Sequence, residues 1–325
     1  MTWLVTGGAG YIGSHVVQAF LEAGLPVVVV DDLSTGHRSF VPAEVPFIQA
    51  DINDTPVLTG TLREHEVAGI VHVAGFKYAG VSVQEPLQTY RANVSGTVSV
   101  LQAARDAGVP NLVFSSSAAT YGTPQTETVT EDTATGPESP YGESKLIGEW
   151  LIADEARATG LRHTSLRYFN VVGSGYPHLV DTSPHNLFPL VFDAILDGRQ
   201  PTIFGDDYPT PDGTCVRDYI HVSDLAVSHV SAARRLQAGE ELAPVYNLGS
   251  GDGTSVRQIM DAMAAVTGRD VAPQIKDRRP GDPPRIVAEG ALAARDIDWA
   301  MRHSLEQMVE SAWTARQRWQ DRAQD

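Results

Sequence analysis

A tyrosine and a lysine that follow a cluster of serines carry the chemistry suggested by this sequence. Ser115–Ser117 end the apolar run 112–114, and Tyr141 and Lys145 stand four residues apart in a later segment. A spacing of four places both side chains on one face of a helix. Because a nearby ammonium group favours a phenolate, we expect Lys145 to lower the pKa of Tyr141 and make it a general base. Ser117 is expected to hydrogen-bond the same substrate oxygen.

The same tyrosine and lysine have a simpler interpretation as an ordinary pair on an amphipathic helix. Ser139 suits the N-cap of such a helix, and Pro140 its first position. A catalytic role is favoured only together with two further features. One is a cofactor fingerprint elsewhere in the chain. The other is the place of the serines at the end of a predicted parallel strand, where α/β proteins bind ligands.

A glycine-rich turn near the N-terminus supplies the fingerprint. Gly7, Gly10 and Gly13 follow the apolar run 3–5 and lead into a segment, 14–23, whose apolar residues have helical spacing. In dinucleotide-binding proteins the first glycine allows a tight turn and the second lets the backbone approach a pyrophosphate. The third lets the helix pack closely on the strand. The N-terminus of the helix then presents free N–H groups to the phosphates.

The acid at the end of the next apolar run selects the cofactor. Residues 27–30 are all valine and are followed by Asp31. A carboxylate at this position binds a ribose 2′-hydroxyl and repels a 2′-phosphate. The next residues, Asp32 and Leu33, offer no arginine that could accept NADP. The predicted cofactor is therefore NAD.

The elements around these residues alternate between strand and helix patterns. Such alternation predicts a parallel sheet with helices on both faces, that is, an α/β fold with a Rossmann-type doubly wound sheet. The strand-like runs are 3–5, 27–30, 46–49, 69–73, 111–115 and 162–168, and the helical patterns are 14–23, 55–65, 86–107 and 141–159.

The composition of the chain changes after Asn170. Segment 173–184 is rich in Gly, Pro, Ser and Asp and is expected to be a loop before a helix at about 187–197. A last helix is expected from Ser304, with Gln307 completing a capping box. We expect a Rossmann domain over residues 1–170, to which 218–247 returns, and a smaller C-terminal substrate-binding region over 171–325.

Composition narrows the possible partners. The 325 residues carry a net charge of −16, which argues against nucleic-acid binding because phosphates require a basic surface. Cys215 is the single cysteine, so neither a disulfide framework nor a cysteine-based metal cluster is expected, and we predict no metal. The sequence shows no signal-peptide pattern and no apolar run of 18 residues, so we expect a cytoplasmic protein with no membrane partner.

These motifs resemble the extended short-chain dehydrogenase/reductase family, in which Tyr-x-x-x-Lys follows a Rossmann fingerprint. Over nearly the whole chain the sequence is similar to the UDP-glucose 4-epimerases of that family. The resemblance implies reversible C4 epimerisation of UDP-glucose and UDP-galactose through a 4-keto intermediate, with tightly bound NAD. The segments that carry the likeness are 7–15, 31–33, 51–52, 74–77, 82–87, 114–122, 139–145, 167–170, 203–208, 212–214, 216–222, 246–249 and 279–282.

The resemblance also implies the roles of individual residues, with Tyr141, Lys145 and Ser117 catalytic. It assigns to NAD binding Gly7, Gly10, Tyr11, Ile12, Gly13, Asp31, Asp32, Leu33, Ser34, Thr35, Gly36, Asp51, Ile52, Val73, Ala74, Gly75, Lys77, Asn93, Ser115, Tyr141, Lys145 and Phe169. It assigns to the UDP-sugar Lys77, Ser117, Ala118, Ala119, Tyr141, Asn170, Asn186, Leu187, Phe204, Arg217, Arg279, Asp282 and Ile286. It further implies a homodimer whose helices near 93–107 and 141–157 pair through Val94, Val98, Leu101, Leu146 and Trp150.

The chain departs from the family pattern in two places. The segment between Gly173 and Asn186 is shorter than usual, and the paired Asn-Asn that ends it in the family reads His185-Asn186 here. Ala92 stands where an asparagine often precedes Asn93. These differences concern details of substrate and cofactor contacts, not the reaction.

Other functions fit the sequence less well. A sugar-nucleotide 4,6-dehydratase needs an acid and a base after Ser117, whereas Ala118 and Ala119 cannot transfer protons. An inactive NAD-sensing regulator would usually lack Tyr141 or Lys145, and both are present. Epimerases of the same family that act on UDP-N-acetylhexosamine or UDP-glucuronate remain alternatives.

Two arginines have alternative interpretations of their own. Arg217 and Arg279 have guanidinium groups that suit a diphosphate. Each could instead form a structural ion pair, with Asp218 or Asp282.

Overall fold

The centre of the molecule is a seven-stranded, wholly parallel sheet. The computed structural model describes residues 1–279 and 282–322. Every pair of neighbouring strands in this sheet runs parallel, as expected for a doubly wound fold, so the predicted fold class is confirmed. In spatial order the strands are β11 (Val245–Leu248), β6 (Arg162–Tyr168), β5 (Asn111–Ser117), β4 (Val67–His72), β1 (Thr2–Thr6), β2 (Val27–Asp31) and β3 (Phe47–Gln49).

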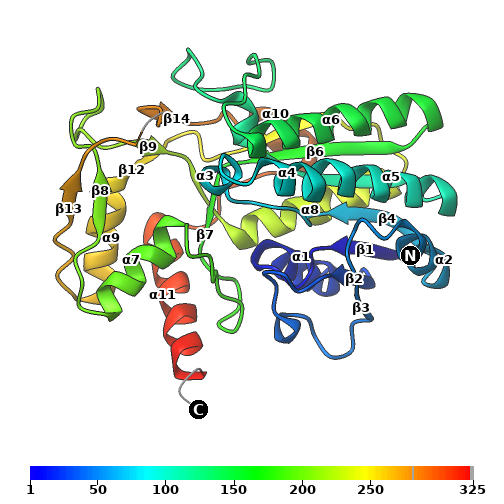
Figure 1. The fold of residues 1–325 in the computed structure, drawn as a ribbon, viewed down its shortest axis with the longest axis horizontal. Coiled ribbons are helices and arrows are strands. Elements are labelled where there is room, and N and C mark those ends of the chain that lie inside the picture. Colours follow the sequence, from blue (N-terminus) through cyan, green and yellow to red (C-terminus); the bar gives the residue numbers. More distant parts are fainter. Residues whose placement is uncertain (280–281, 323–325) are drawn as a thin grey trace.

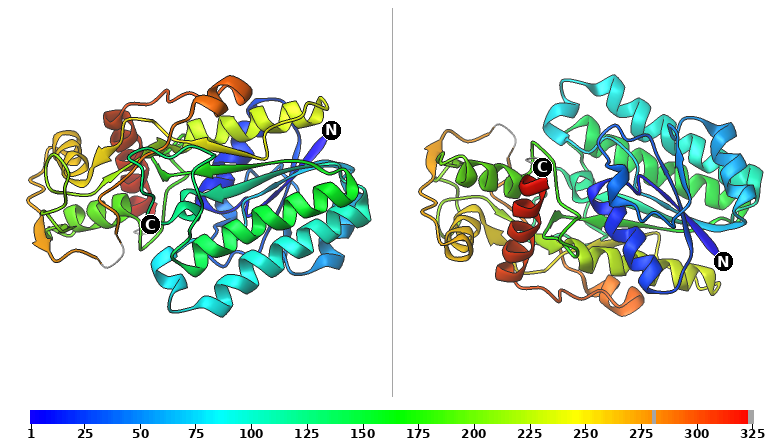
Figure 2. Two further views of the ribbon diagram at one scale, coloured as in Figure 1. Left: turned by 90° about the horizontal axis from the view of Figure 1, so that it is seen from above. Right: turned by 90° about the horizontal axis from the view of Figure 1, so that it is seen from below.

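Helices cover both faces of this sheet (Figure 2). Alternate residues of each strand point to opposite faces, so Val5 packs in the core under one helical layer and Leu4 in the core under the other. The first layer contains α1 (Tyr11–Glu22) and α8 (Val222–Gln237), and the second contains α2 (Thr55–Glu64), α5 (Gly96–Ala107) and α6 (Pro140–Thr159).

Local sequence explains where α6 begins and ends. The hydroxyl of Ser139 accepts a hydrogen bond from the backbone N–H of Gly142, and Pro140 takes the first helical position. These are the cap and the start predicted from the sequence. Gly160 ends the helix in the left-handed conformation, at φ 78°.

The predicted helix 86–107 is interrupted in the structure. It consists of α4 (Pro86–Tyr90), a π-helical turn over Arg91–Ser95 and α5. Such wide turns occur mostly as single insertions and often at functional sites. Here the turn carries Asn93, whose side chain reaches the loop after β4. The short helix α3 (Ala79–Ser82) lies between that loop and α4.

Most of the remaining elements form a smaller region beside the carboxyl ends of the strands (Figure 1). Its helices are α7 (Leu187–Leu196), α9 (Val256–Thr267) and α11 (Leu305–Arg322), which share one apolar core. Its strands form small sheets: β7 (Asn170–Val172) with β10 (Tyr219–His221); β8 (Thr202–Phe204) with β13 (Gln274–Lys276); and β12 (Thr254–Ser255), β9 (Val216–Arg217) and β14 (Arg285–Ile286). Helix α10 (Ala291–Ile297) instead packs on β11 and α8 of the larger part.

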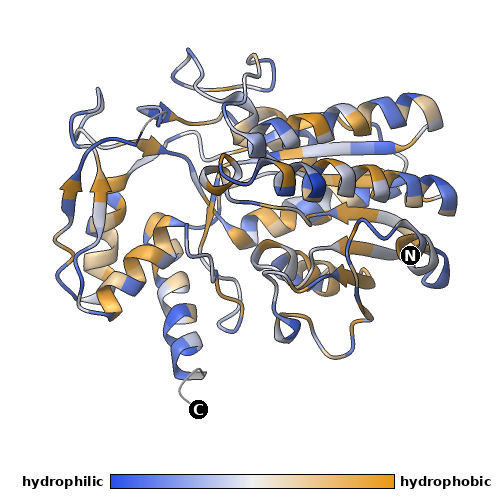
Figure 3. Cartoon of the chain, viewed as in Figure 1, coloured by the Kyte–Doolittle hydropathy of each residue, from blue (hydrophilic) through white to orange (hydrophobic). Residues whose placement is uncertain are grey.

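Hydropathy separates the strands into two kinds (Figure 3). The central strands β1, β2 and β4 are rich in apolar residues, whereas β6 is largely polar although most of it is buried. Three polar side chains of β6 make hydrogen bonds to neighbouring elements: Arg162 donates to Asn111, Thr164 to the carbonyl oxygen of Ala243 and Arg167 to Glu149. Within the described residues, no helix is both long and apolar enough to cross a membrane.

Candidate active site

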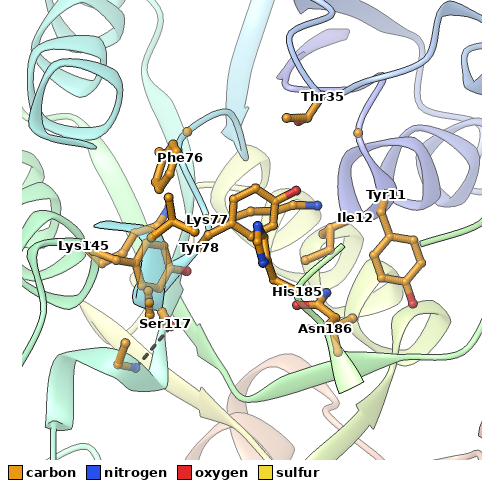
Figure 4. Close-up of a pocket in the computed structure, with 18 of the residues that line it drawn as sticks. Tyr11, Ile12, Thr35, Phe76, Lys77, Tyr78, Ser117, Lys145, His185 and Asn186 are labelled. Atoms are coloured by element: carbon orange, nitrogen blue, oxygen red, sulfur yellow. Dashed lines mark hydrogen bonds between the residues drawn. The ribbon is translucent and has the colours of Figure 1, made fainter. Parts of the chain in front are cut away.

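One large cavity opens at the carboxyl ends of the sheet strands. Its volume is about 1560 Å³, above the usual range of roughly 300–1,000 Å³ for a site that holds one small molecule. The glycine turn lines it on one side and Tyr141 and Lys145 line it on another. In Figure 4 the side chains of Ser117 and Lys145 lie at one end of the view and those of Tyr11 and Ile12 at the other. A cavity of this extent has room for a dinucleotide and a nucleotide-sugar together.

The glycine turn between β1 and α1 has the geometry of a pyrophosphate cradle. Gly7 has φ +70°, which an L-residue adopts at a cost, and a Cβ on Gly13 would lie 2.0 Å from the carbonyl oxygen of Gly7. A Cβ on Gly10 would meet only that oxygen, at 3.3 Å, so the side of Gly10 is open to the cavity. No side chain caps the N-terminus of α1. Free N–H groups and the positive helix end therefore point into the cavity and suit the pyrophosphate of NAD.

Asp31 stands at the edge of the same cavity, at the end of β2. One carboxylate oxygen accepts a hydrogen bond from the backbone N–H of Ala9, at 2.9 Å, and the other from that of Leu33, at 2.8 Å. Burial raises the pKa of Asp31, while these two hydrogen bonds lower it. Leu33 holds its amide in this position by adopting φ 61°. The orientation of the carboxylate is thus set in advance for a ribose hydroxyl.

The catalytic candidates come together where β5 meets α6. The side chain of Tyr141 lies near that of Ser117, and Ser117 Oγ accepts a hydrogen bond from the N–H of Ala119 at 3.2 Å, which caps the 3₁₀ turn after β5. Lys145 Nζ donates to the carbonyl oxygen of Ser115 at 2.9 Å and lies 5.9 Å from the ring centre of Tyr141. The phenol, the hydroxyl and the ammonium group thus surround one point of the cavity wall.

In this structure the pKa of Tyr141 is raised and not lowered as expected, because burial is the largest influence on it. Burial raises the pKa of Tyr141, and the neighbouring hydroxyl of Ser117 opposes this by lowering it. Burial also lowers the pKa of Lys145 to about 8, against the carboxylate of Glu149, which raises it. Desolvation is a property of the packed site, so spacing along the helix could not reveal it.

The substrate candidates line the opposite part of the cavity. Arg217 Nη2 donates to Asp282 Oδ1 at 2.9 Å, so one of the two ion pairs considered for Arg217 is present while the arginine still lines the cavity. Arg279 lies over the ring of Phe204, with 4.0 Å between the guanidinium carbon and the ring centre. The N-terminus of α7, at Asn186, has no side-chain cap. Two guanidinium groups and an open helix N-terminus suit a diphosphate.

Most of the residues assigned from the resemblance line this cavity. Those on the cofactor side are Gly7, Gly10, Tyr11, Ile12, Gly13, Asp31, Asp32, Ser34, Thr35, Gly36, Asp51, Ile52, Val73, Ala74, Gly75, Lys77 and Phe169. Those on the substrate side are Ala118, Ala119, Asn170, Asn186, Leu187, Arg217, Arg279, Asp282 and Ile286. Residues Pro280 and Gly281 of the segment 279–282 lie outside the described residues.

Four assigned residues stand behind the lining instead of in it. Leu33 holds Asp31 through its amide, and Phe204 supports Arg279. Asn93 uses its amide on the backbone N–H and carbonyl of Phe76 and on the hydroxyl of Ser144.

The fourth, Ser115, pairs its hydroxyl with His229 Nε2 at 2.9 Å. The carbonyl oxygen of Ser115 accepts a hydrogen bond from Lys145, so each of the four residues contacts a neighbour that lines the cavity.

Three aromatic residues of the cavity wall were not predicted from the sequence, and two of them lie face to edge. The rings of Tyr78 and His185 lie 4.7 Å apart at 70° and join the loop after β4 to the loop before α7 (Figure 4). Tyr168, at the end of β6, also lines the cavity. Each of the three stands next to an assigned residue, Lys77, Asn186 or Phe169, and adjacency was the only signal.

Known proteins share this fold and these motifs. Residues 3–249 match the family described as the NAD dependent epimerase/dehydratase family. The UDP-glucose 4-epimerase of Azospirillum brasilense is 44% identical over 314 residues, which cover 95% of this chain and 90% of that protein.

Two crystal structures extend the likeness to three dimensions. UDP-glucose 4-epimerase from Stenotrophomonas maltophila, with bound NAD and formylated UDP-arabinopyranose, has a TM-score of 0.94 and 41% identity, covering 99% of both chains. The enzyme from Brucella ovis, in complex with NAD, has a TM-score of 0.92 and 41% identity, covering 96% of this chain and 97% of that one. The family and the cofactor predicted from the sequence are thereby confirmed. The chain therefore belongs to the NAD-dependent epimerase/dehydratase family and, within it, to the UDP-glucose 4-epimerases, and it is an enzyme that uses NAD.

Proposed function

We propose that this enzyme interconverts UDP-glucose and UDP-galactose by inverting C4 of the hexose. The observation that carries the proposal is that Tyr141, Ser117 and Lys145 share one cavity with the glycine turn and with Arg217. A single cavity can hold the cofactor and the nucleotide-sugar against the same proton-transfer group, which an oxidation followed by a reduction at one carbon requires.

Tyr141 is the proposed general base and acid. Its phenol takes the proton from the C4 hydroxyl and returns it after inversion, while Ser117 hydrogen-bonds the same oxygen. Because burial raises the pKa of Tyr141, the phenolate needs a positive charge nearby, and Lys145 supplies it. Bound NAD would supply a reversible hydride acceptor for C4, and so would end each cycle unchanged.

The reaction requires that the diphosphate of the substrate be bound firmly and the hexose loosely. Arg217, Arg279 and the N-terminus of α7 would hold the diphosphate firmly by charge and N–H groups. The hexose side is mostly apolar, with Ala118, Phe169 and Ile286 in one small cluster. An apolar wall makes few directional bonds to the sugar, so the 4-keto sugar can turn and present its other face.

Exposed apolar residues support the proposed homodimer. Leu87 is 83% exposed, Trp150 58% and Val98 47%, on the adjacent helices α4, α6 and α5. Two of the contacts expected from the resemblance are corrected here, because Leu101 and Leu146 are buried within the chain and cannot reach a partner. A second copy of the chain would cover the exposed face with α5 and α6 of each protomer.

Two further features of the proposal concern the whole chain. Strand β11 pairs with β6 in the parallel sheet, and helix α8 packs on that sheet. Both observations support a domain of residues 1–170 to which residues 218–247 return. We also assign the enzyme to the cytoplasm, where UDP-sugars and NAD are available to it.

A coupled test addresses the reaction and its cofactor together. The purified protein is incubated with UDP-galactose and no added NAD, and the product is identified by chromatography. UDP-glucose should form, and denaturing the protein should release NAD. Conversion of UDP-galactose to a different product, or recovery of NADP instead of NAD, would contradict the proposal. Tyr141→Phe, handled identically, gives the background rate.

A further inference from the structure

A charged side chain lies directly behind Lys145 on the same face of α6. Tyr141, Lys145 and Glu149 follow one another at intervals of four residues, so they form one stripe along the helix. Lys145 is 5% exposed and Glu149 7%. The proposed reaction uses the tyrosine and the lysine and gives the glutamate no role.

The central sheet holds both buried groups through neighbouring residues of β5. Lys145 Nζ donates to the carbonyl oxygen of Ser115 at 2.9 Å, and Ser116 Oγ donates to Glu149 Oε1 at 2.5 Å. Arg167 of β6, which is in register with Ser116, donates from Nε to Oε1 at 2.9 Å and from Nη2 to Oε2 at 2.6 Å. Three hydrogen bonds thus fix the Glu149 carboxylate next to Lys145.

Arg167 is fixed from its other side as well. Its guanidinium carbon lies 4.8 Å from the ring centre of Tyr121, whose hydroxyl donates to Asn247 Oδ1 at 2.7 Å. A buried ion pair is a poor source of stability, because desolvating two charges costs about as much as their attraction returns. Stability alone therefore does not explain the buried ion pair between Glu149 and Arg167.

The group that gains from the carboxylate is Lys145. Burial lowers the pKa of Lys145 to about 8, and Glu149 opposes that change. Other groups near Lys145 bring no negative charge: burial raises the pKa of Tyr141 and keeps it a phenol, and burial lowers the pKa of His72 to about 3 and keeps it neutral. Arg167 is itself a cation. The negative charge that supports the lysine comes from Glu149.

We infer that Glu149 is a positioning residue of the epimerase reaction: its carboxylate, locked by Arg167 and Ser116, holds Lys145 in the charged form beside Tyr141. The inference rests on the proposed roles of Tyr141 and Lys145. A charged lysine lowers the cost of forming the tyrosinate, whereas a neutral one could offer only a weak hydrogen bond. Loss of the carboxylate should therefore make activity decline at a lower pH on the alkaline side.

The lysine content of the chain makes this charge directly measurable. The lysines are Lys77, Lys145 and Lys276, of which the first and last are exposed and Lys145 is buried. With ¹³C-labelled lysine, NMR titration of the NAD-loaded protein follows each ammonium group, and Lys145→Arg identifies the buried signal. In Glu149→Gln the midpoint of Lys145 should fall by roughly one pH unit, the low end of the effect of a neighbouring charge. The alkaline limb of kcat should move in the same direction.

Two further variants keep the test decisive. Glu155→Gln removes a carboxylate from the same helix, where it pairs with Arg105 at the surface, and should leave the Lys145 midpoint at its parental value. Glu149→Gln leaves Arg167 buried without its partner, which could prevent folding. The double variant Glu149→Gln/Arg167→Met removes both charges and should again lower the midpoint.

An unmoved Lys145 midpoint in the folded variants overturns the inference, even if kcat falls. A midpoint that falls while the alkaline limb of kcat stays in place overturns it too, because the charge on Lys145 would then not govern the rate. Failure of the proposed function is a separate result: Tyr141→Phe, in the otherwise parental enzyme, would retain its activity.

Discussion

The phenol of Tyr11 donates a 2.6 Å hydrogen bond to the carbonyl oxygen of Gly173, and so joins the cofactor side of the cavity to the substrate side. One helical turn further on, His15 Nε2 accepts a hydrogen bond from the N–H of Gly175 at 3.0 Å. The first turn of α1 thereby holds the start of the loop that leads to Asn186. Its own N-terminus faces the cofactor, so the two ligand sites share one rigid element.

Tyr11→Phe should weaken both stability and cofactor retention. The substitution removes the hydrogen bond and leaves the Gly173 carbonyl unpaired in a buried place, at a cost of about 1–3 kcal/mol in the free energy of unfolding. NAD should dissociate faster during dialysis. Tyr176→Phe, which loses a contact to Glu22 at the surface, is the matched control and should change neither. Unaltered NAD retention in Tyr11→Phe would show that the loop does not depend on this bond.

Tyr141→Phe should lower kcat by at least roughly 100-fold, the low end of what a general base contributes. UDP binding, followed by calorimetry, should stay close to that of the parental enzyme, because the ring and its packing are kept. Near-full activity in this variant would mean that another residue deprotonates the sugar, and the role given to α6 would be wrong.

Trp150→Asp should convert a dimer into a monomer. Trp150 lies exposed on α6, and a buried aromatic side chain at an interface centre is often worth 2 kcal/mol or more. Light scattering at micromolar concentration measures the change. Val227→Asp, on the exposed side of α8, is the control and should remain dimeric. A parental protein that is already monomeric would refute the assembly.

Ile286 should set the range of sugars. The resemblance implies that residue 286 lies near the C2 substituent of the hexose. An isoleucine there is smaller than a tyrosine, but its side chain is bulkier and more rigid than that of a small residue. We expect strong activity on UDP-galactose and weak activity on UDP-N-acetylglucosamine, with a preference on the order of 10- to 200-fold, since apolar bulk discriminates by about 1–3 kcal/mol.

Substitution of Ile286 should move this preference in both directions. Ile286→Tyr should abolish activity on UDP-N-acetylglucosamine and keep activity on UDP-galactose. Ile286→Ala should raise the activity on UDP-N-acetylglucosamine. Equal kcat/KM ratios in both variants would assign the choice to the loop before Asn186.

Buried histidines should make the enzyme sensitive to mild acid. Burial lowers the pKa of His15 and His229 to about 4, and of His72 and His221 to about 3. Below pH 6.5 these histidines are protonated in the unfolded chain but stay neutral in the folded chain. Stability is therefore fully present above pH 6.5 and falls as the pH drops toward 4, by up to about 1.4 kcal/mol per pH unit for each histidine.

Urea unfolding between pH 4.5 and 7 measures this slope. His229→Gln should reduce it by one histidine's share. A slope that His229→Gln does not alter would place the acid sensitivity elsewhere.

Local patterns in the sequence were enough to predict the cofactor and six of the seven strands of the sheet, all but β11. Gly7, Gly13 and Asp31 act through turn geometry, close packing and charge, all of which depend on neighbours along the chain. The alternation of apolar runs with helical spacing placed β6 correctly at 162–168, although its residues are mostly polar. Tyr141 and Lys145 were found for the same reason, because a helix sets the relation between residues four apart.

The tertiary structure decided which residues line the cavity and which titratable groups are buried. Asn93 and Ser115 were expected in the site, yet long-range hydrogen bonds to Phe76 and His229 occupy them behind it. Desolvation by the packed core raises the pKa of Tyr141, an effect that the spacing to Lys145 along the helix does not reveal. Burial and contacts between distant segments arise only when the whole chain folds, so a pattern of nearby residues cannot contain them.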